Sequence, residues 1–299
     1  MRVAEVGSRV TLKNILFLTD FSEPSEAALP FAAAIAREYG CKIYALHVLT
    51  PAMYTYAPPE LIVETISAQE EAAEKDMLRL TAQLAGLPHE TIVERGVAVW
   101  PSLEEALKQH DIDLIVLGTH GRTGAAKFLL GSVAEEIFRR SPVPVLTIGP
   151  SAHNGAHSSA RFHRVLFATD FSPESLAATP YAISFAQENE AELLLLNVIH
   201  ERERQDGSAC EAASVANAMY NLGELVPKNA EMWCKPETVV HYGVPAESIL
   251  DLSKERGADL IVLGVRDPAK RMGAATHLER TTAHRVVAHA HCPVLTVRG

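Results

Sequence analysis

Short apolar runs alternate with amphipathic segments along the whole chain. In the first half, β-type runs fall near 14–19, 42–48, 91–95, 113–118 and 144–148, and helical patterns fall near 24–39, 60–85, 101–110 and 132–140. The runs LFLT, IYALHV and LIVLG are almost continuously apolar, as expected for parallel strands that are covered on both faces. The pattern predicts an open, doubly wound α/β domain, in which ligands bind beyond the carboxyl ends of the strands.

The same pattern occurs twice. Residues 15–40 align with residues 165–190, with 13 of 26 positions identical, and the runs DLIVLG and PVLT then recur in the same order in each half. A repeat of about 150 residues corresponds to a whole domain. We therefore expect a first domain over 1–150, a small and polar linker over 151–163, and a second domain over 164–299.

The predicted fold class is α/β, with two tandem doubly wound, mostly parallel five-stranded sheets. The last strands of the halves, VPVLTI and CPVLTV, are apolar and would lie at sheet edges, where an unpaired strand invites aggregation. We expect them to pair, so that the halves pack as a pseudo-twofold pair within one chain. Whether the chain also forms a homodimer stays open. In the second half, Ser172 and Pro173 predict a helix N-cap and first turn.

The composition narrows the functional classes. Hydrophobic residues make up 47% of the 299 residues, and the net charge is −10, with 13 basic and 19 acidic residues in 1–150 and 14 and 18 in 151–299. Neither half is basic, so we expect no nucleic-acid partner. No apolar run reaches the roughly 18 residues that span a membrane, and the first residues lack the apolar core of a signal peptide. The expected compartment is the cytoplasm, without membrane attachment.

Residue types that often bind metals are present without a metal-binding pattern. The cysteines form no CxxC pair and are expected to be buried or half-buried free thiols: Cys41, Cys210, Cys234 and Cys292. Four histidines near the C-terminus do not stack on one helical face, and we interpret them as parts of a solvated helix: His277, His284, His289 and His291. We expect no metal site built from side chains.

A glycine-rich loop follows the fourth predicted strand of the first half. Its spacing is Gly118-x2-Gly121-x9-Gly131-Ser132, and the amphipathic segment VAEEIFRR comes next. Glycine lets the backbone approach an anion closely, and free N–H groups at a helix start carry partial positive charge. Arg122 would add a mobile positive charge. The loop predicts a phosphate cradle; the alternative is that the glycines form turns and Ser132 is only an N-cap.

A carboxylate follows the first predicted strand. Asp20 in LTDFS lies at the carboxyl edge of the sheet, where it could accept hydrogen bonds from ribose hydroxyls. The alternative role of Asp20 is to cap the turn into the next helix.

These motifs resemble the universal stress protein family. LTDFS, LHVL, GTHG and LLGS occur in that order and on the expected elements, and the resemblance covers nearly the whole chain twice, as in a tandem two-domain member. The resemblance implies an adenine-nucleotide fold related to that of nucleotide α-hydrolases. It also implies that ATP, or another adenine nucleotide, is bound with Mg²⁺ held among the phosphate oxygens.

The family's motif can be transferred to this sequence position by position. Asp20, with Thr19 before it, would hold the ribose, Val48 would read adenine through its backbone, and Gly118 would pack near the ribose. The remaining positions would cradle the phosphates: Gly121, Arg122, Gly131, Ser132 and Val133. ATP, ADP, AMP and other adenine compounds are not distinguished, because a backbone contact leaves little trace in the sequence.

The second half departs from this motif in its phosphate loop. Thr169, Asp170 and Val198 repeat the first half, but Asp267 stands where Gly121 does and would repel phosphate. Alignment on the closing strand places Arg280 and Thr281 opposite Gly131 and Ser132. We expect a degenerate, structural copy; the alternative is a site for a different ligand bound by basic side chains, namely Lys270, Arg271 or Arg280.

The sequence predicts binding rather than catalysis. It has no GxSxG motif and none of the HxGH or SGGxDS-like loops of the adenylyl-transferring relatives, and we interpret His120 as a loop side chain rather than a base. The expected function is that of a regulatory module in which ATP changes conformation or the choice of an unknown protein partner. A slow ATPase that acts as a switch, and a structural protein that uses no nucleotide, remain alternatives.

Overall fold

The computed structural model describes residues 10–50, 59–119, 130–153, 161–201, 208–228, 230, 234–266 and 281–299. The first half alternates strands and helices in this order: β1 Asn14–Leu18, α1 Glu23–Glu26, α2 Leu29–Tyr39, β2 Lys42–Leu49, α3 Pro59–Gln83, β3 His89–Arg95, α4 Val99–Gln109, β4 Leu114–Gly118, α5 Ser132–Arg140 and β5 Val145–Ile148. The strands and helices predicted for this half are confirmed to within about two residues, with one correction.

The correction concerns the helix predicted over 24–39, which is two helices, α1 and α2. Pro30 is the second residue of α2 and has no N–H group to donate to Glu26. The chain therefore turns at Ala28, whose N–H bonds to Ser25 O at 3.0 Å, and the second helix starts with the bond from Ala32 N to Ala28 O at 3.2 Å.

The second half repeats the order of the first after a short 3₁₀ helix, η1. Its elements are η1 Pro150–His153, β6 Arg164–Ala168, α6 Pro173–Leu176, α7 Thr179–Glu188, β7 Glu192–Ile199, α8 Ser208–Leu225, β8 Glu237–Tyr242, α9 Pro245–Glu255, β9 Leu260–Val265, α10 Thr282–His289 and β10 Val294–Arg298. The predicted helix start is confirmed: Ser172 is the N-cap of α6, its side chain accepts from Ser175 N, and Pro173 is the first helical residue.

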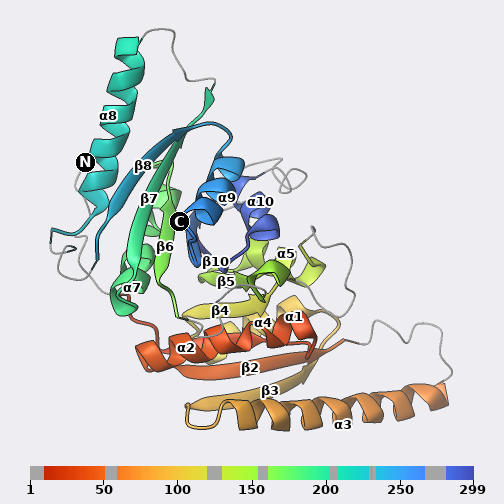
Figure 1. Ribbon diagram of the computed structural model, residues 1–299. Coiled ribbons are helices and arrows are strands. Elements are labelled where there is room, and N and C mark those ends of the chain that lie inside the picture. The colour runs from red at the N-terminus through yellow and green to blue at the C-terminus, as the bar shows by residue number, and fades with distance from the viewer. Residues whose placement is uncertain are drawn as a thin grey trace.

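The described strands form one continuous sheet of ten strands, in the order β3-β2-β1-β4-β5-β10-β9-β6-β7-β8 (Figure 1). Pairs within each half are parallel, whereas β5 and β10 pair antiparallel with Leu146 opposite Leu295. The expected pairing of the two last strands is thus confirmed. Two threonine hydroxyls strengthen the junction, since Thr147 Oγ1 donates to Val294 O and Thr296 Oγ1 donates to Val145 O.

Helices cover both faces of this sheet, as the doubly wound prediction requires. One buried cluster packs α2, α3, α7 and α8 against one face, and a second packs α4, α5, α9 and α10 against the other. Each cluster contains residues from both halves. In Figure 1, α3 lies alongside β3 at one edge of the sheet, and α8 lies alongside β8 at the other. No helix in the described part of the chain is both long enough and apolar enough to cross a membrane.

The segment predicted as a polar linker contributes one large side chain to the core. Phe162 is only 2% exposed, with its ring centroid 6.2 Å from that of Phe31 on α2 and 5.7 Å from that of Phe185 on α7. Nearby, the hydroxyls of Tyr39 and Ser184 lie 3.0 Å apart. The two halves therefore share apolar packing in addition to the β5–β10 junction.

Candidate functional site

The turn after β1 is shaped by hydroxyl groups. Thr19 Oγ1 lies 3.0 Å from Ser25 Oγ and accepts from Phe21 N at 3.0 Å, while Ser22 is the N-cap of α1. These bonds hold Phe21 at a φ of 58°, a left-handed conformation that is uncommon for a bulky residue. The same bonds recur in the second half, where Phe171 has a φ of 60°. The turn is therefore a property of the TDFS sequence rather than of one site.

Asp20 is oriented by this turn. Its Oδ1 accepts from Ser22 N at 3.0 Å and from Ser22 Oγ at 2.5 Å. Asp20 therefore does support the turn, as its alternative role required, but Ser22 and not Asp20 caps the helix. The carboxylate also lines a cavity, so the two roles of Asp20 are compatible.

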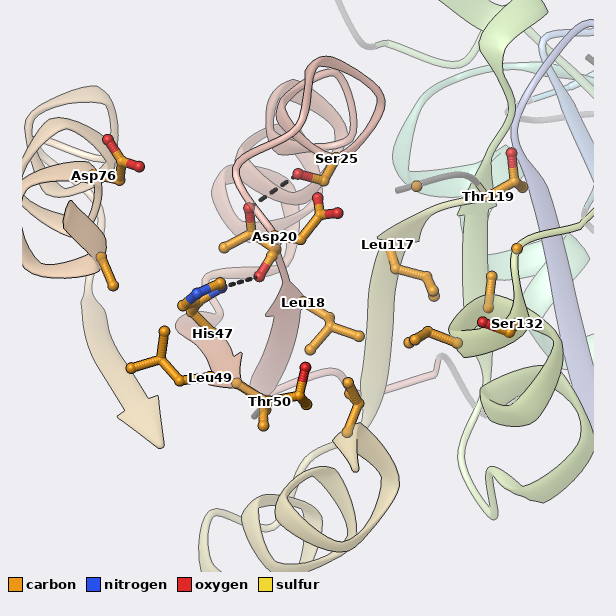
Figure 2. Close-up of a pocket in the computed structure, with 18 of the residues that line it drawn as sticks. Leu18, Asp20, Ser25, His47, Leu49, Thr50, Asp76, Leu117, Thr119 and Ser132 are labelled. Atoms are coloured by element: carbon orange, nitrogen blue, oxygen red, sulfur yellow. Dashed lines mark hydrogen bonds between the residues drawn. The ribbon is translucent and has the colours of Figure 1, made fainter. Parts of the chain in front are cut away.

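This cavity of about 410 Å³ lies beyond the carboxyl ends of β1, β2 and β4. The strand order reverses between β1 and β4, which is where doubly wound sheets bind ligands. The volume is in the range of about 300–1,000 Å³ that is typical of small-molecule sites. Figure 2 shows Asp76 of α3 on one side of the cavity and Ser132 of α5 on the other, with Asp20, His47 and Thr50 between them.

The edge of β2 presents its backbone toward the cavity at Val48. Leu46 O accepts from Thr19 N at 3.0 Å, so Leu46 directs its backbone groups toward β1. Strand residues alternate in direction, and Val48 therefore directs its N–H and C=O to the same side, beyond the last paired residue of β1. Leu49 faces the opposite way, because its carbonyl accepts from Gly96 N at 3.1 Å. Val48 is among the residues that line the cavity.

His47 is a cavity residue that the sequence reasoning missed. Its Nδ1 lies 2.8 Å from Thr19 O, and because a carbonyl can only accept, this nitrogen carries the proton. The ring packs on Phe21 with centroids 4.6 Å apart and is buried. In the second half Asn197 makes the equivalent bond to Thr169 O at 2.9 Å. The sequence contained one indication of this role, since His47 directly precedes Val48 in the LHVL motif.

Helix α3 supplies the other residues that the sequence reasoning missed. Gln69 and Asp76 line the cavity from α3, together with Ala72 and Ala73. Asp76 also forms an ion pair with Arg79, one turn further along α3. The sequence showed α3 as an amphipathic helix but not which strand end the helix crosses, because that depends on the loop lengths before and after it.

Gly118 ends β4 and lines the cavity, but its lack of a side chain has a structural reason. A Cβ atom there would lie 2.5 Å from Pro24 O on α1. Gly264, the equivalent residue of β9, would clash in the same way with Glu174 O on α6. Glycine at the end of this strand is therefore required by the close approach of the first helix in both halves.

Helix α5 starts at the cavity without a side-chain cap from any described residue. Its N-cap is Gly131, at φ −64° and ψ 149°, so the alternative reading in which Ser132 is the N-cap is wrong. Gly131 N donates to Thr119 O at 2.8 Å, and the first bond into Gly131 O comes from Glu135 N. The N–H groups of Ser132, Val133 and Ala134 thus lack acceptors within the helix, and all three residues line the cavity.

Gly121 and Arg122 lie outside the described residues, as do His120, Asp267 and Arg280. The structure therefore brings together Thr19, Asp20, Val48, Gly118, Gly131, Ser132 and Val133 around one cavity. Among the described residues, no group of three or more histidine, cysteine or acidic side chains could hold a metal ion.

The corresponding place in the second half is different. The cavity beside Asp170 is about 150 Å³, and Arg266 Nη2 lies 3.4 Å from Asp170 Oδ2. Partial loss of water around Asp170 would by itself raise its pKa, but hydrogen bonds from Ser172 and Ser175, together with the charge of Arg266, lower it. The start of α10 is capped, because the Thr281 side chain accepts from His284 N.

Two sequence-based expectations about other residues can be compared with the structure. Cys41, Cys234 and Cys292 are free and buried, as expected, and burial raises the pKa of the Cys41 thiol to about 12 and that of Cys234 to about 11. The side chain of Cys210 lies outside the described residues. The interpretation of the histidines as solvated is wrong for His284. This residue is buried, and its ring centroid lies 6.3 Å from that of Phe138 on α5.

Comparison with known proteins supports the duplication. The model of the universal stress protein family matches residues 11–149 and 161–298. A universal stress protein of Mycolicibacterium smegmatis is 26% identical over 305 aligned positions, which cover 95% of this chain and 97% of the relative. One from Methanocaldococcus jannaschii is 34% identical over 140 residues, which cover 46% of this chain and 81% of the relative.

A solved universal stress protein from Archaeoglobus fulgidus has the same fold over nearly the whole length. The TM-score is 0.68 at 23% identity, covering 95% of this chain and 98% of that chain. With the family model matched twice, in the order in which the sheet is duplicated, the chain belongs to the universal stress protein family as a tandem two-domain member.

Proposed function

We propose that the first half binds an adenine nucleotide, with ATP as the expected ligand, and that the chain acts as a regulatory module in a stress response. The observation that carries this proposal is the difference between two helix starts. Helix α5 begins at a cavity of about 410 Å³ with no side-chain cap from a described residue, whereas α10 is capped by Thr281 beside a cavity of about 150 Å³. An uncapped helix start favours phosphate.

The rest of the cavity has the chemistry that an adenosine group requires. Val48 directs a backbone donor and acceptor toward the cavity, which suits the edge of an adenine ring. Leu18, Val99 and Leu117 provide apolar surface, and Asp20 offers a carboxylate to ribose hydroxyls. A divalent cation would be held by phosphate oxygens and would screen their charge.

The proposed role is binding that changes conformation or partner choice. In the sequence, Gly121 and Arg122 lie in the segment that joins β4 to α5, and we expect phosphates to bind this segment as well as the start of α5. Ligand binding and loop conformation would then be coupled. The protein partner that responds to this change is not identified by the chemistry of the site.

The first test is to identify the small molecule that is released when the purified native chain is denatured, by mass spectrometry. Calorimetric titration of the ligand-free chain with ATP, ADP, AMP and adenosine should then rank affinity by the number of phosphates. Gly131→Val should abolish ATP binding by blocking the approach of phosphate to α5. The backbone angles of Gly131 are open to any residue, so a loss of binding would not come from strain.

The matched control is Thr281→Val at the start of α10, which should leave ATP affinity unchanged. ATP affinity retained in Gly131→Val would overturn the phosphate assignment. Sustained hydrolysis of bound ATP that disappears in His120→Ala would instead identify a slow ATPase. A native chain with no affinity for any of these nucleotides would favour the structural role.

A further inference from the structure

Arg298, at the end of β10, binds the carboxyl end of α5 across the junction between the halves. Its Nε donates to Ser141 O at 2.8 Å, and its Nη2 donates to Arg139 O at 2.8 Å and to Phe138 O at 3.0 Å. These carbonyls belong to the last turn and C-cap of α5, where backbone acceptors have no partner within the helix. A guanidinium is also the favoured charge at a helix C-terminus.

The two halves are related by a pseudo-twofold axis, but the position equivalent to Arg298 does not make the equivalent contact. The residue that corresponds to Arg298 in the first half is Gly149, and a Cβ atom there would lie 3.5 Å from Ala290 O, the C-cap of α10. The same place beside α10 is therefore occupied by a residue with no side chain. Only in one of the two equivalent positions does an arginine hold the end of a helix.

The helix that Arg298 holds is the one whose other end faces the larger cavity. Helix α5 has nine residues and is about 14 Å long, so its two ends move together. Phe138 in its last turn also packs against His284 of α10. The carboxyl end of α5 is thus fixed by the second half, while its amino end lies beside Asp20 and Gly118 in the first.

We propose that Arg298 is a positioning residue for the phosphate-binding end of α5, and that the second half acts in nucleotide binding by holding this helix in place. The inference rests on the proposed function of the first half. It gives the second half a role that needs no ligand of its own. The asymmetry between Arg298 and Gly149 then matches the asymmetry between the two cavities.

The test compares Arg298→Gly, which copies Gly149, with Arg298→Lys and with Arg285→Ala. Arg285 of α10 is a partly exposed arginine that pairs with Glu247, so its loss changes the net charge equally while leaving the carbonyls at the end of α5 with their donor. Titrations with ATP and with adenosine are made on the full chain, well below its unfolding temperature. Hydrogen exchange of the Glu135 amide, which makes the first hydrogen bond of α5 to Gly131 O, is measured without nucleotide.

Arg298→Gly should weaken ATP binding about tenfold, leave adenosine binding unchanged and speed amide exchange at the start of α5. Arg298→Lys, which keeps the charge but loses the planar fork, should fall between Arg298→Gly and the wild type. Arg285→Ala should bind both ligands as the wild type does. A purely structural role for Arg298 would change the unfolding temperature without separating ATP from adenosine.

Equal ATP affinity in the wild type and Arg298→Gly would overturn the inference and leave the proposed function standing. Equal losses for ATP and adenosine would also overturn it, because the effect would not act through α5. A wild type that binds neither ligand would overturn the proposed function, and the inference with it. If Arg298→Gly does not fold, Arg298→Lys gives the same comparison, with the same outcomes for and against.

Discussion

Arg266 forms an ion pair with Asp170, nitrogen to oxygen 3.4 Å, at the position where the first half has Asp20 beside its larger cavity. The two aspartates are oriented in the same way, since the Oδ1 atom of each accepts from a serine N at 3.0 Å and the same serine's Oγ at 2.5 Å. Duplication preserved the turn, whereas the surroundings of the carboxylates diverged. In the second half a guanidinium of the chain itself is placed next to the carboxylate.

This difference predicts unequal effects of the same substitution in the two halves. Asp20→Asn keeps an oxygen that can accept from Ser22 but removes the negative charge offered to ribose hydroxyls, so ATP affinity should fall about tenfold. Asp170→Asn is the matched control and should leave ATP affinity unchanged. Calorimetric titration of both variants measures the effect. An equal loss in both, or in neither, would contradict the assignment of Asp20.

The pairing of Asp170 with Arg266 predicts a pH effect. Partial loss of water around Asp170 opposes its ionisation, but bonds from Ser172 and Ser175 and the charge of Arg266 lower its pKa below the ordinary value. Because the pKa of Asp170 is lower in the folded state, the ionised carboxylate stabilises the fold when the pH is above the unfolded-state pKa. This stabilisation is lost as the pH falls through the folded-state pKa. Both side chains are more than half exposed, so the effect of this pair on stability should be small.

Arg266→Ala should therefore raise the pKa of Asp170 by a small amount, because the serine hydrogen bonds, which lower this pKa more than the charge of Arg266 does, remain. NMR titration of the Asp170 carboxyl carbon measures the shift directly. Arg285→Ala, which removes an arginine paired with Glu247, serves as the control and should not move this pKa. A pKa of Asp170 that does not change in Arg266→Ala would mean that the ion pair is not formed in solution.

The strand-end glycines predict a steric effect on stability. Gly118→Ala would place a methyl group 2.5 Å from Pro24 O, so α1 must shift, at a cost of about 1–3 kcal/mol in the free energy of unfolding. Gly223→Ala in α8 is the matched control: no described heavy atom would lie within 4 Å of its Cβ, and alanine should stabilise this helix by about 0.5–1 kcal/mol. Urea unfolding measures both changes. A neutral Gly118→Ala would show that α1 does not approach β4 so closely.

Gly118 also illustrates what the sequence could reveal about the site. The DLIVLG repeat shows glycine at the end of this strand in both halves, but only the packing of α1 and α6 explains it. The glycines after the strand are a different case. Helices α5 and α10 both form, but among the described residues a side-chain cap is found at α10, from Thr281, and not at α5. The glycine that ends the strand occurs in both halves and does not distinguish them. Gly121 and Gly131 after the strand have no glycine at the aligned positions of the second half, and they pointed to the half with the larger cavity.

The order of strands and helices was predictable because apolar runs and amphipathic segments are local patterns. The contacts of His47, Asp76 and Arg298 were not, because each depends on which distant element crosses a strand end. His47 bonds to a carbonyl 28 residues away, and Arg298 bonds to carbonyls about 160 residues away. The expected β5–β10 junction was an exception, since the need to cover two apolar edge strands follows from their sequences alone.

The shared core predicts that the two halves unfold together. Phe162 packs against Phe31 of one half and Phe185 of the other, and Phe162→Ala should cost about 3–5 kcal/mol in the free energy of unfolding. Because its partners belong to both halves, amides of β1 and of β6 should exchange faster together. Phe162→Leu, which fills most of the space, should cost clearly less. Faster exchange confined to β6 would show that Phe162 stabilises the second half alone, and that the first half is held by the β5–β10 junction and its own core.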